Sequence, residues 1–344
     1  MTLVALTHGY ITPDGGWAMG GEVSLHRTLT AAKRDTVVLT RTDTPYMVDG
    51  IRVEPIATDD VLNVNADPTP IVEQLRQLGA TAVLAQNELS LPAVRAARTL
   101  NIPSIVSVHT PPRYGANIRR AVQEATHRVY NTHTSSVEWR LPGLVLHPPV
   151  PPMPTRTTPR GDAYTLLSNL SNKGVAVVLD LAERMPGQRF IIVRSPAETT
   201  HGLPTFDERA AALPNVEVMP RVSPEKVAAT YLTQTRILLA PSRYETYSLV
   251  PIEAAAYGIP SVVVDTPHVR EGIGDAAELV PPLNLDATAA AIERIEADYT
   301  RHSHLAHARA VYLTARQGIE LDRWADWLEQ VTHVRRDPRR RRTA

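Results

Sequence analysis

Short apolar runs alternate with amphipathic segments along most of the chain. In the first half, β-branched runs at 2–8 and 35–41 flank a helical pattern, and residues 70–80 place Leu75 and Leu78 at helical spacing before Gly79. The second half repeats this alternation, with apolar runs at 164–170, 189–195, 236–242 and 260–265. Short buried strands that alternate with helices are typical of parallel sheets covered on both faces. The pattern therefore predicts an α/β protein.

A proline-rich segment, 147–162, interrupts the alternation and has no periodic apolar pattern. We interpret it as a semi-rigid connection between two doubly wound domains with a cleft between them. Near the end of the chain, 287–316 predicts a long, broken helical stretch, and 321–333 predicts a separate final helix with Leu321, Trp324 and Leu328 on one face. The expected parts of the chain are 1–148, a linker over 149–162, 163–318, a helix over 319–334 and a tail over 335–344.

Composition excludes several classes of site. The chain has no cysteine, which rules out disulfides, cysteine nucleophiles and thiolate metal sites. It has no apolar run of the roughly 18–20 residues that a membrane span needs, and its first residues lack the features of a signal peptide. The expected location is therefore the cytoplasm.

The formal net charge is zero, but the tail is strongly basic because Arg335–Arg342 holds six arginines and one aspartate. Such a tail can contact an anionic partner, such as the phosphates of nucleic acid or lipid. A solvated, disordered end is the interpretation that we favour, since the rest of the chain is acidic and nucleic-acid-binding domains are usually basic.

Residues 241–261, PSRYETYSLVPIEAAAYGIPS, carry a glutamate at each end of a mostly apolar run. The preceding strand should end near Ser242, which places Glu245 in the loop above it. Ser248 is a suitable N-cap, and Gly258 followed by Pro260 ends the helix. Glu253 then lies about one turn inside the helix, so that both carboxylates can point toward one pocket.

This arrangement suits a sugar attached to a diphosphate. The backbone N–H groups of Tyr247, Ser248 and Leu249 lie at a helix N-terminus, where an anion is favoured. Glu253 can accept hydrogen bonds from a ribose diol, and Glu245 can hold sugar hydroxyls. An isolated pair of glutamates at this spacing would more simply be a capped helix with a buried ion pair.

The match extends well beyond the two glutamates. Residues 238–265 resemble, almost position by position, the donor-site signature of retaining glycosyltransferases of the GT-B fold, family 4, and 266–282 are similar to the family segment that contains a glutamate, here Glu271. The resemblance covers the second half of the chain well and the first half more weakly. It implies two Rossmann-like domains facing a cleft, the first on the acceptor side and the second binding the nucleotide sugar. The helix over 319–334 should return to the N-terminal domain.

The segment 166–193 both matches the family and departs from it. Lys173 and Gly174 match a Lys-Gly pair, so Lys173 is the expected phosphate-binding cation. Ser168 and Asn169 stand where Gly and Arg are common, which removes one positive charge beside the diphosphate. Asn169 is then the donor-site residue at that position, and Arg194 and Arg243 are candidates to replace the missing charge.

The resemblance also names residues in the first half. Gly20 and Gly21 match a glycine pair that approaches the donor phosphate or sugar, although an ordinary strand-to-helix turn would look the same. His109, at the end of an apolar run, matches a histidine that faces the transferred sugar. On the acceptor side, Trp17, Arg113 and Arg119 are weaker candidates. Together with Arg120, these arginines suggest an anionic acceptor or, more simply, a solvated helix face.

The function implied is transfer of a sugar from a UDP- or GDP-sugar to an acceptor hydroxyl, with retention at the anomeric carbon. His109, Glu245 and Lys173 are the expected catalytic residues. Lys173 and the helix N-terminus would stabilise the leaving diphosphate, while His109 and Glu245 orient the sugar. No Asp-x-Asp occurs, so we expect no metal and no cofactor beyond the donor itself.

Several alternatives remain open. The acceptor could be a glycan, a lipid, a small molecule, a protein or a modified DNA base. The chain could instead be a nucleotide-sugar epimerase of the same fold, or a non-catalytic protein that binds nucleotide sugars. The histidines His302, His304 and His307 raise the possibility of a zinc site, but no carboxylate completes a familiar motif and a solvated helix explains them better.

Overall fold

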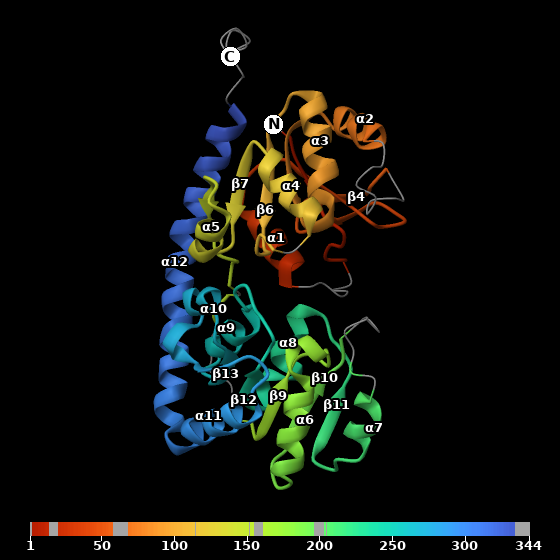
Figure 1. Ribbon diagram of the computed structural model, residues 1–344. Helices are drawn as coiled ribbons and strands as arrows, with labels where there is room; N and C mark the ends of the chain where they lie inside the picture. The colour runs from red at the N-terminus through yellow and green to blue at the C-terminus, as the bar shows by residue number, and fades with distance from the viewer. Residues whose placement is uncertain are drawn as a thin grey trace. The chain divides into compact units, whose positions relative to one another are not determined.

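The computed structural model describes residues 2–13, 20–57, 68–113, 115–150, 152–154, 161–195, 203 and 205–333. These residues form two compact units, each coloured by position along the chain in Figure 1. The first unit contains residues 2–13, 21–147 and 318–333, and the second contains Gly20 and the described residues of 148–317. The chain therefore passes between the units at 20–21, at 147–148 and at 317–318.

The first unit is built on a sheet whose described strands run in the order β3-β4-β2-β1-β5-β6-β7-β8. All neighbours are parallel except β3 and β4, which form a hairpin. The strands are β1 (Thr2–Leu6), β2 (Thr36–Thr40), β3 (Tyr46–Val48), β4 (Ile51–Pro55), β5 (Ala80–Gln86), β6 (Ser104–Val108), β7 (His127–Tyr130) and β8 (Leu144–Val145).

Helices cover both faces of this sheet because its central strands are apolar on both sides. The helices are α1 (Gly20–Ala31), α2 (Thr69–Gln77), α3 (Ser90–Leu100), α4 (Ala116–Glu124) and α5 (His133–Trp139), with a single 3₁₀ turn η1 (Asn87–Leu89). One face packs against α2, α3 and α4, visible beside the sheet in Figure 1. The other packs against α1 and the end of the last helix of the chain.

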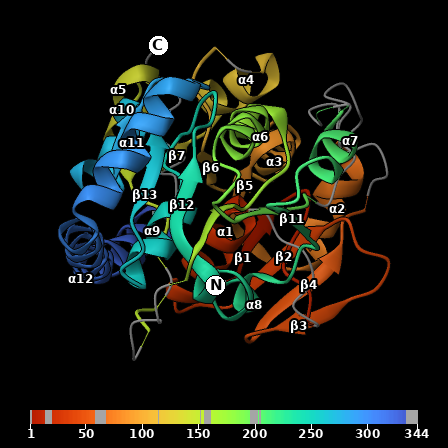
Figure 2. The ribbon, with the colours of Figure 1, turned by 90° about the horizontal axis from the view of Figure 1, so that it is seen from below.

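The second unit has a parallel sheet with the strand order β11-β10-β9-β12-β13-β14. Its strands are β9 (Ala163–Leu166), β10 (Phe190–Val193), β11 (Val216–Met219), β12 (Thr235–Ala240), β13 (Ser261–Val264) and β14 (Glu278–Val280). The helical elements are η2 (Ser171–Lys173), α6 (Val175–Arg184), α7 (Phe206–Ala211), α8 (Pro224–Thr230), η3 (Leu232–Gln234), α9 (Leu249–Ala256), α10 (Pro267–Glu271), η4 (Gly274–Ala276) and α11 (Leu285–Ala297). Figure 2 shows α6 and α11 on one side of this sheet and α8 and α9 on the other.

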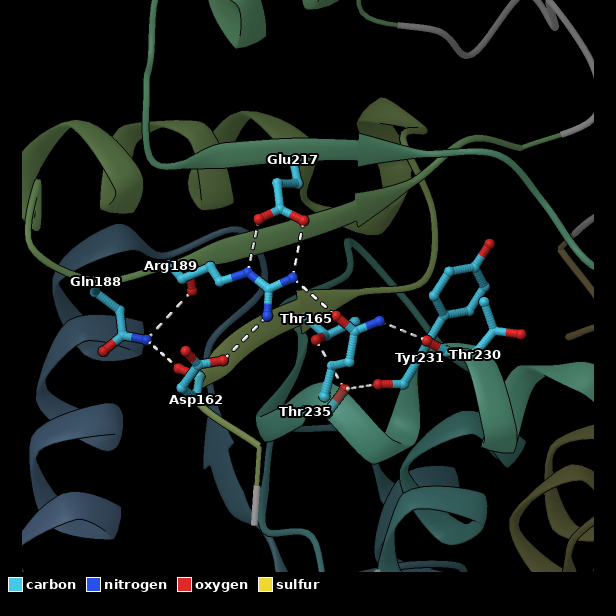
Figure 3. Close-up of polar contacts among 9 residues, drawn as sticks. Asp162, Thr165, Gln188, Arg189, Glu217, Thr230, Tyr231 and Thr235 are labelled. Atoms are coloured by element: carbon cyan, nitrogen blue, oxygen red, sulfur yellow. Dashed lines mark hydrogen bonds and ion pairs between the residues drawn. The ribbon is translucent and has the colours of Figure 1, made fainter. Parts of the chain in front are cut away.

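A polar network ties together the beginnings of neighbouring strands in the second unit (Figure 3). Arg189 donates to both carboxylate oxygens of Glu217 at 2.7 and 2.8 Å, and also to Asp162 at 3.0 Å and the side chain of Gln234 at 2.8 Å. The hydrogen bonds from Arg189 lower the pKa of Glu217. This network lies at the strand ends opposite to those where ligands of parallel sheets bind, so we assign it a structural role.

The last helix, α12 (Tyr299–His333), is one continuous element of 35 residues. The prediction of a separate final helix was wrong, because the helix does not end near residue 318. The stretch over 287–316 is broken, and the break lies at Asp298, between α11 and α12. Within the first unit, Trp324 and Leu328 are fully buried, and Trp324 Nε1 donates to the carbonyl of Thr28 at 3.1 Å. Burial of one face on each side of Gly318 outweighs the cost of about 1 kcal/mol for glycine in a helix.

Several elements had not been expected from the sequence, including α10 and β14. The β3–β4 hairpin turns at Asp49 and Gly50, whose φ values of 46° and 78° fit the left-handed residues of a tight hairpin. Helix α5 begins after Thr132, whose hydroxyl accepts a hydrogen bond from the Ser135 N–H. Half of the expected linker, and the tail over 335–344, lie outside the described residues.

Candidate active site

Each sheet has one point where the strand order reverses direction, and ligands of open α/β sheets bind at the carboxyl ends of the strands beside that point. In the second unit this point lies between β9 and β12. The loops that follow these two strands carry Lys173 and Glu245. In the first unit it lies between β1 and β5, and β5 ends at Gln86.

Lys173 and Glu245 meet at the switch point of the second unit. Lys173 Nζ lies 2.7 Å from Glu245 Oε1, and the Ser242 hydroxyl donates to the same oxygen at 2.8 Å. The side chain of Glu245 is 13% exposed and that of Lys173 is 37% exposed, so the cation keeps a solvent-facing side. Thr266 also donates to the Glu245 carbonyl at 3.1 Å, which fixes the loop. A cation positioned by a carboxylate at this edge can bind a phosphate group.

The turn before α9 is strained. Ser248 occupies the N-cap position as predicted, but its φ of 64° and ψ of 92° are rare for a residue with a side chain, and its hydroxyl makes no capping hydrogen bond. The first N–H groups of a helix have no partner within the helix. The backbone at Ser248 and Leu249 therefore offers donors to an anion. Glu253 lies one turn further along α9 and is partly buried.

Two arginines of α12 form hydrogen bonds close to this turn, with Tyr247 and with the end of α10. Arg316 donates to the hydroxyl of Tyr247 at 2.8 Å, and Tyr247 is buried directly before Ser248. Arg316 and Arg309 both donate to the carbonyl of Glu271, at 3.3 and 2.9 Å. Burial, followed by repulsion from Arg316, lowers the pKa of Arg309. Neither arginine was expected from the sequence, because both lie far along the chain from the residues that they contact.

Asn169 stands in place of the family's arginine, and its amide oxygen is already hydrogen-bonded. Its Oδ1 accepts a hydrogen bond from the Ser195 N–H at 2.7 Å, and Ser168 lies 3.0 Å from the Ser195 hydroxyl. Of the two candidate replacements, Arg194 forms an ion pair with Asp207. Arg243 is exposed, and its guanidinium makes no hydrogen bond or ion pair to the residues that the structure describes. Arg243 is therefore the more available cation.

His109 follows β6 in the first unit and belongs to a hydrogen-bonded chain. Its Nε2 lies 3.0 Å from Gln86 Oε1, while the amide nitrogen of Gln86 donates to Thr7 Oγ1 at 3.0 Å. Because Gln86 Oε1 can only accept, this chain assigns the proton of His109 to Nε2 and leaves Nδ1 as an acceptor. Burial lowers the pKa of His109 to about 4, so the ring is neutral at physiological pH.

The other residues predicted in the first half are less well defined by their surroundings. Gly20 and Gly21 begin α1 with ordinary backbone angles, and a Cβ on Gly21 would meet no atom within 4 Å. Arg113 is exposed in the loop after β6, and Arg119 donates to the Pro112 carbonyl at 3.1 Å. Trp17 lies outside the described residues.

No group of three or more His, Asp or Glu side chains within the described ranges could hold a metal ion. His302 lies 3.8 Å from Glu278 and is not part of such a group. Within the same described ranges, no helix is both long enough and apolar enough to cross a bilayer.

Comparisons with known proteins identify the second unit. Residues 164–298 match the family model "Glycosyl transferases group 1". A search of curated proteins found no match.

Solved structures match the chain over nearly its whole length. HepE from Anabaena, in complex with UDP-glucose, is 16% identical, with a TM-score of 0.79 over 96% of this chain and 100% of that one. Trehalose-6-phosphate synthase OtsA is 12% identical, with a TM-score of 0.75 over 97% and 99%. Sucrose-phosphate synthase from Thermosynechococcus elongatus is 15% identical, with a TM-score of 0.70 over 96% and 98%. At these identities the likeness shows the fold, and the family match supplies the activity. Residues 164–298 are therefore a glycosyltransferase domain of the group 1 type, and the chain has the GT-B fold of these solved structures.

Proposed function

We propose that this protein transfers a sugar from a UDP-sugar to an acceptor hydroxyl with retention of anomeric configuration and without a metal ion. The observation that carries the proposal is the contact between Lys173 and Glu245 beside the open N-terminus of α9. It combines a phosphate-binding cation, a carboxylate for sugar hydroxyls and backbone donors within one short stretch. UDP is the first nucleotide to test, because HepE was solved with UDP-glucose and with UDP; a GDP-sugar is the second choice.

In the donor complex, the diphosphate would lie between Lys173 and the N–H groups at Ser248 and Leu249. Glu253 would accept hydrogen bonds from the ribose, and Glu245 from the transferred sugar. Asn169 would contribute to the same pocket through the loop that it orders rather than through charge. Arg243 is the residue that we expect to supply the missing positive charge.

The reaction breaks the bond between the anomeric carbon and the diphosphate oxygen and forms one to the acceptor oxygen on the same face of the sugar. The leaving phosphate oxygen takes the proton of the acceptor hydroxyl, so no protein base is needed. The transition state carries positive charge on the sugar and growing negative charge on the diphosphate. Lys173 and the helix N-terminus stabilise that negative charge, and this is the main contribution of the protein.

His109 of the first unit is proposed to orient the sugar. Its neutral ring presents Nδ1 as an acceptor for a sugar hydroxyl, and the lowered pKa keeps it neutral. Gly20 and Gly21 are proposed to leave room for the donor at the start of α1. The acceptor is proposed to bind the first unit near Trp17, Arg113 and Arg119, which would favour an anionic acceptor.

The proposal is tested first by thermal stabilisation with UDP, GDP, ADP, CMP and their sugars. A ligand at about 100 times its dissociation constant should stabilise the protein by about 2.7 kcal/mol. UDP and UDP-glucose should shift the wild-type melting temperature but not that of Glu253→Ala. The matched control, Glu293→Ala, changes a carboxylate on α11 and should retain the shift. If no nucleotide shifts the wild type, the proposed donor site is wrong.

Turnover then tests the chemistry. The anomeric proton of the product, followed by NMR during the reaction, reports whether the configuration is retained. The rate in EDTA should equal the rate in added Mg²⁺ or Mn²⁺. An inverted product, or activity that disappears with EDTA and returns with a metal, would reject the corresponding part of the proposal.

A further inference from the structure

One face of α12 is exposed and apolar over about four turns. Of the six large apolar side chains that are exposed in the described residues, four lie on this face: Leu305 at 40%, Val311 at 50%, Tyr312 at 55% and Ile319 at 73% exposed. Together with three small exposed residues they form what we call the α12 stripe, which consists of Leu305, Ala308, Val311, Tyr312, Ala315, Gly318 and Ile319.

The α12 stripe departs from the usual pattern of a surface helix, whose outer face is polar. The inward face of α12 is already packed: Ala306, Ala310 and Leu313 are buried in the core of the second unit. Figures 1 and 2 both place α12 at the outside of that unit, with no other element beyond it. A contiguous exposed apolar face of this kind marks a site of association.

We propose that the α12 stripe is the contact surface of a homodimer in which two copies of α12 pack antiparallel. A two-fold axis between Val311 and Tyr312 makes the stripe self-complementary, as a symmetric dimer requires. Leu305 of one protomer then lies opposite Gly318 of the partner subunit. Ala308 lies opposite Ala315 of the partner subunit. At the axis Val311 lies opposite Tyr312 of the partner subunit, and Ile319 lies opposite His304 of the partner subunit. The small residues at 308, 315 and 318 let the helix axes approach closely.

The charges at the two ends of the stripe support the same arrangement. Arg301 precedes the stripe and Asp322 follows it, both exposed and both at positions that continue the same helical face. The antiparallel pairing that matches Leu305 with Gly318 also places Arg301 of each protomer opposite Asp322 of the partner subunit. A parallel pairing would instead set Arg301 against Arg301. Within the chain, Asp322 is 3.9 Å from Lys33, but both side chains are more than three-quarters exposed, so this pair competes only weakly.

A membrane surface is a less suitable partner. Asp322 and Asp326 are exposed at the end of the stripe and would face anionic headgroups. The middle of the stripe is made of alanine and valine beside a single tyrosine, which gives little apolar volume for insertion. A contact that runs along α12 from Arg301 to Asp322 is about 30 Å long, at the small end of specific interfaces, so we expect a dissociation constant on the order of 10 μM.

Sedimentation velocity of the full chain over about 1 to 200 μM should therefore show a monomer–dimer equilibrium. Ala308→Glu places two carboxylates near the two-fold axis. It should raise the protein concentration at which half of the chains are dimeric at least tenfold, or abolish the dimer. Gln330→Glu, which adds the same charge at another exposed position of α12, should leave it unchanged. Equal melting temperatures for the two variants would show that Ala308→Glu still folds. The proposal would be overturned if the wild type were monomeric at every concentration, or if Ala308→Glu did not change the dissociation constant of the dimer.

A charge swap tests the antiparallel pairing. Arg301→Asp and Asp322→Arg should each weaken the dimer severalfold, and the double variant should restore it. The matched control is Asp326→Arg, about two turns beyond the stripe, which should have no effect. This pairing would be rejected if neither single variant weakened dimerisation, or if the double variant dimerised more weakly than both single variants. Vesicles containing anionic lipid provide the remaining comparison: binding by a monomeric wild type that Ala308→Glu abolishes would assign the stripe to membranes and overturn the dimer.

Discussion

Replacing Glu245 with glutamine should separate nucleotide binding from sugar transfer. In the free protein, the carboxylate of Glu245 holds Lys173 Nζ at 2.7 Å. The diphosphate must compete with Glu245 for this cation. Glu245→Gln removes the competing charge and keeps the shape of the side chain, so that Lys173 is released for phosphate while the sugar loses a charged acceptor.

The magnitude follows from the geometry. Two unit charges about 3 Å apart near a protein surface attract by roughly 5 kcal/mol before hydration is considered. Because the Lys173 side chain is 37% exposed, most of this attraction is offset by lost hydration, and the net value is about 1 kcal/mol. UDP alone should therefore bind Glu245→Gln about fivefold more tightly than the wild type. The kcat/KM for the UDP-sugar should fall by about 10- to 100-fold, since a hydrogen bond to a charged group contributes roughly 1.5–3 kcal/mol.

Isothermal titration calorimetry with UDP, and steady-state kinetics with the UDP-sugar, measure the two effects. Glu217→Gln is the control, because it removes a carboxylate paired with Arg189 at the opposite strand ends and should leave UDP affinity unchanged. Lys173→Met should lose UDP affinity. The reasoning is refuted if Glu245→Gln binds UDP as the wild type does or more weakly, since Glu245 would then not compete with the phosphate.

Three further results are expected. Trp324→Ala should lower the free energy of unfolding by about 3–5 kcal/mol in chemical denaturation, because the indole is fully buried; a loss below about 1 kcal/mol would contradict its place in the core. Tyr247→Phe should weaken UDP binding about threefold, and Arg316→Met, which also removes the hydrogen bond to the Glu271 carbonyl, at least as much. The double variant should bind UDP no more weakly than Arg316→Met, since both substitutions remove the hydrogen bond between Arg316 and Tyr247; additive losses in calorimetry would show that they act separately. His109 has a pKa near 4, below the value of about 6.5 in an unfolded chain, so the unfolded state binds more protons between these pH values and stability falls as the pH decreases through this window. His109→Gln should remove as much as about 3 kcal/mol of that fall at pH 4, measured by denaturation at several pH values, and an unchanged pH dependence would exclude this contribution.

The alternation of apolar runs predicted most strands of both sheets because a buried strand carries its signal within a few consecutive residues. The β3–β4 hairpin escaped notice because its strands are short, although Asp49-Gly50 between alternating residues is itself a turn signal. The continuity of α12 could not be deduced locally. Gly318 weakens a helix by propensity, and only the tertiary burial of residues such as Leu313 and Trp324 keeps it intact.

The site shows the same division between local and distant information. Lys173 and Glu245 were each identified from a local motif and a family resemblance, but their contact joins positions 72 residues apart. Arg316 has no motif, and its role depends on a partner, Tyr247, that lies 69 residues away. The strained backbone of Ser248 was also hidden, since a serine at an N-cap position ordinarily has extended angles. Contacts that depend on how distant segments pack leave little trace in local periodicity.

The course of α12 has a consequence for how the protein is made. Leu3, Leu25 and Val129 belong to a core that also needs Trp324 and Leu328. The ribosome delivers those two side chains only near the end of translation, after the whole second unit has emerged. During synthesis, part of the apolar surface of the first unit therefore stays exposed until residues 324–328 have emerged. The first unit is thus the one whose folding is completed last. A premature stop shortly before residue 324 would damage the beginning of the protein more than its middle.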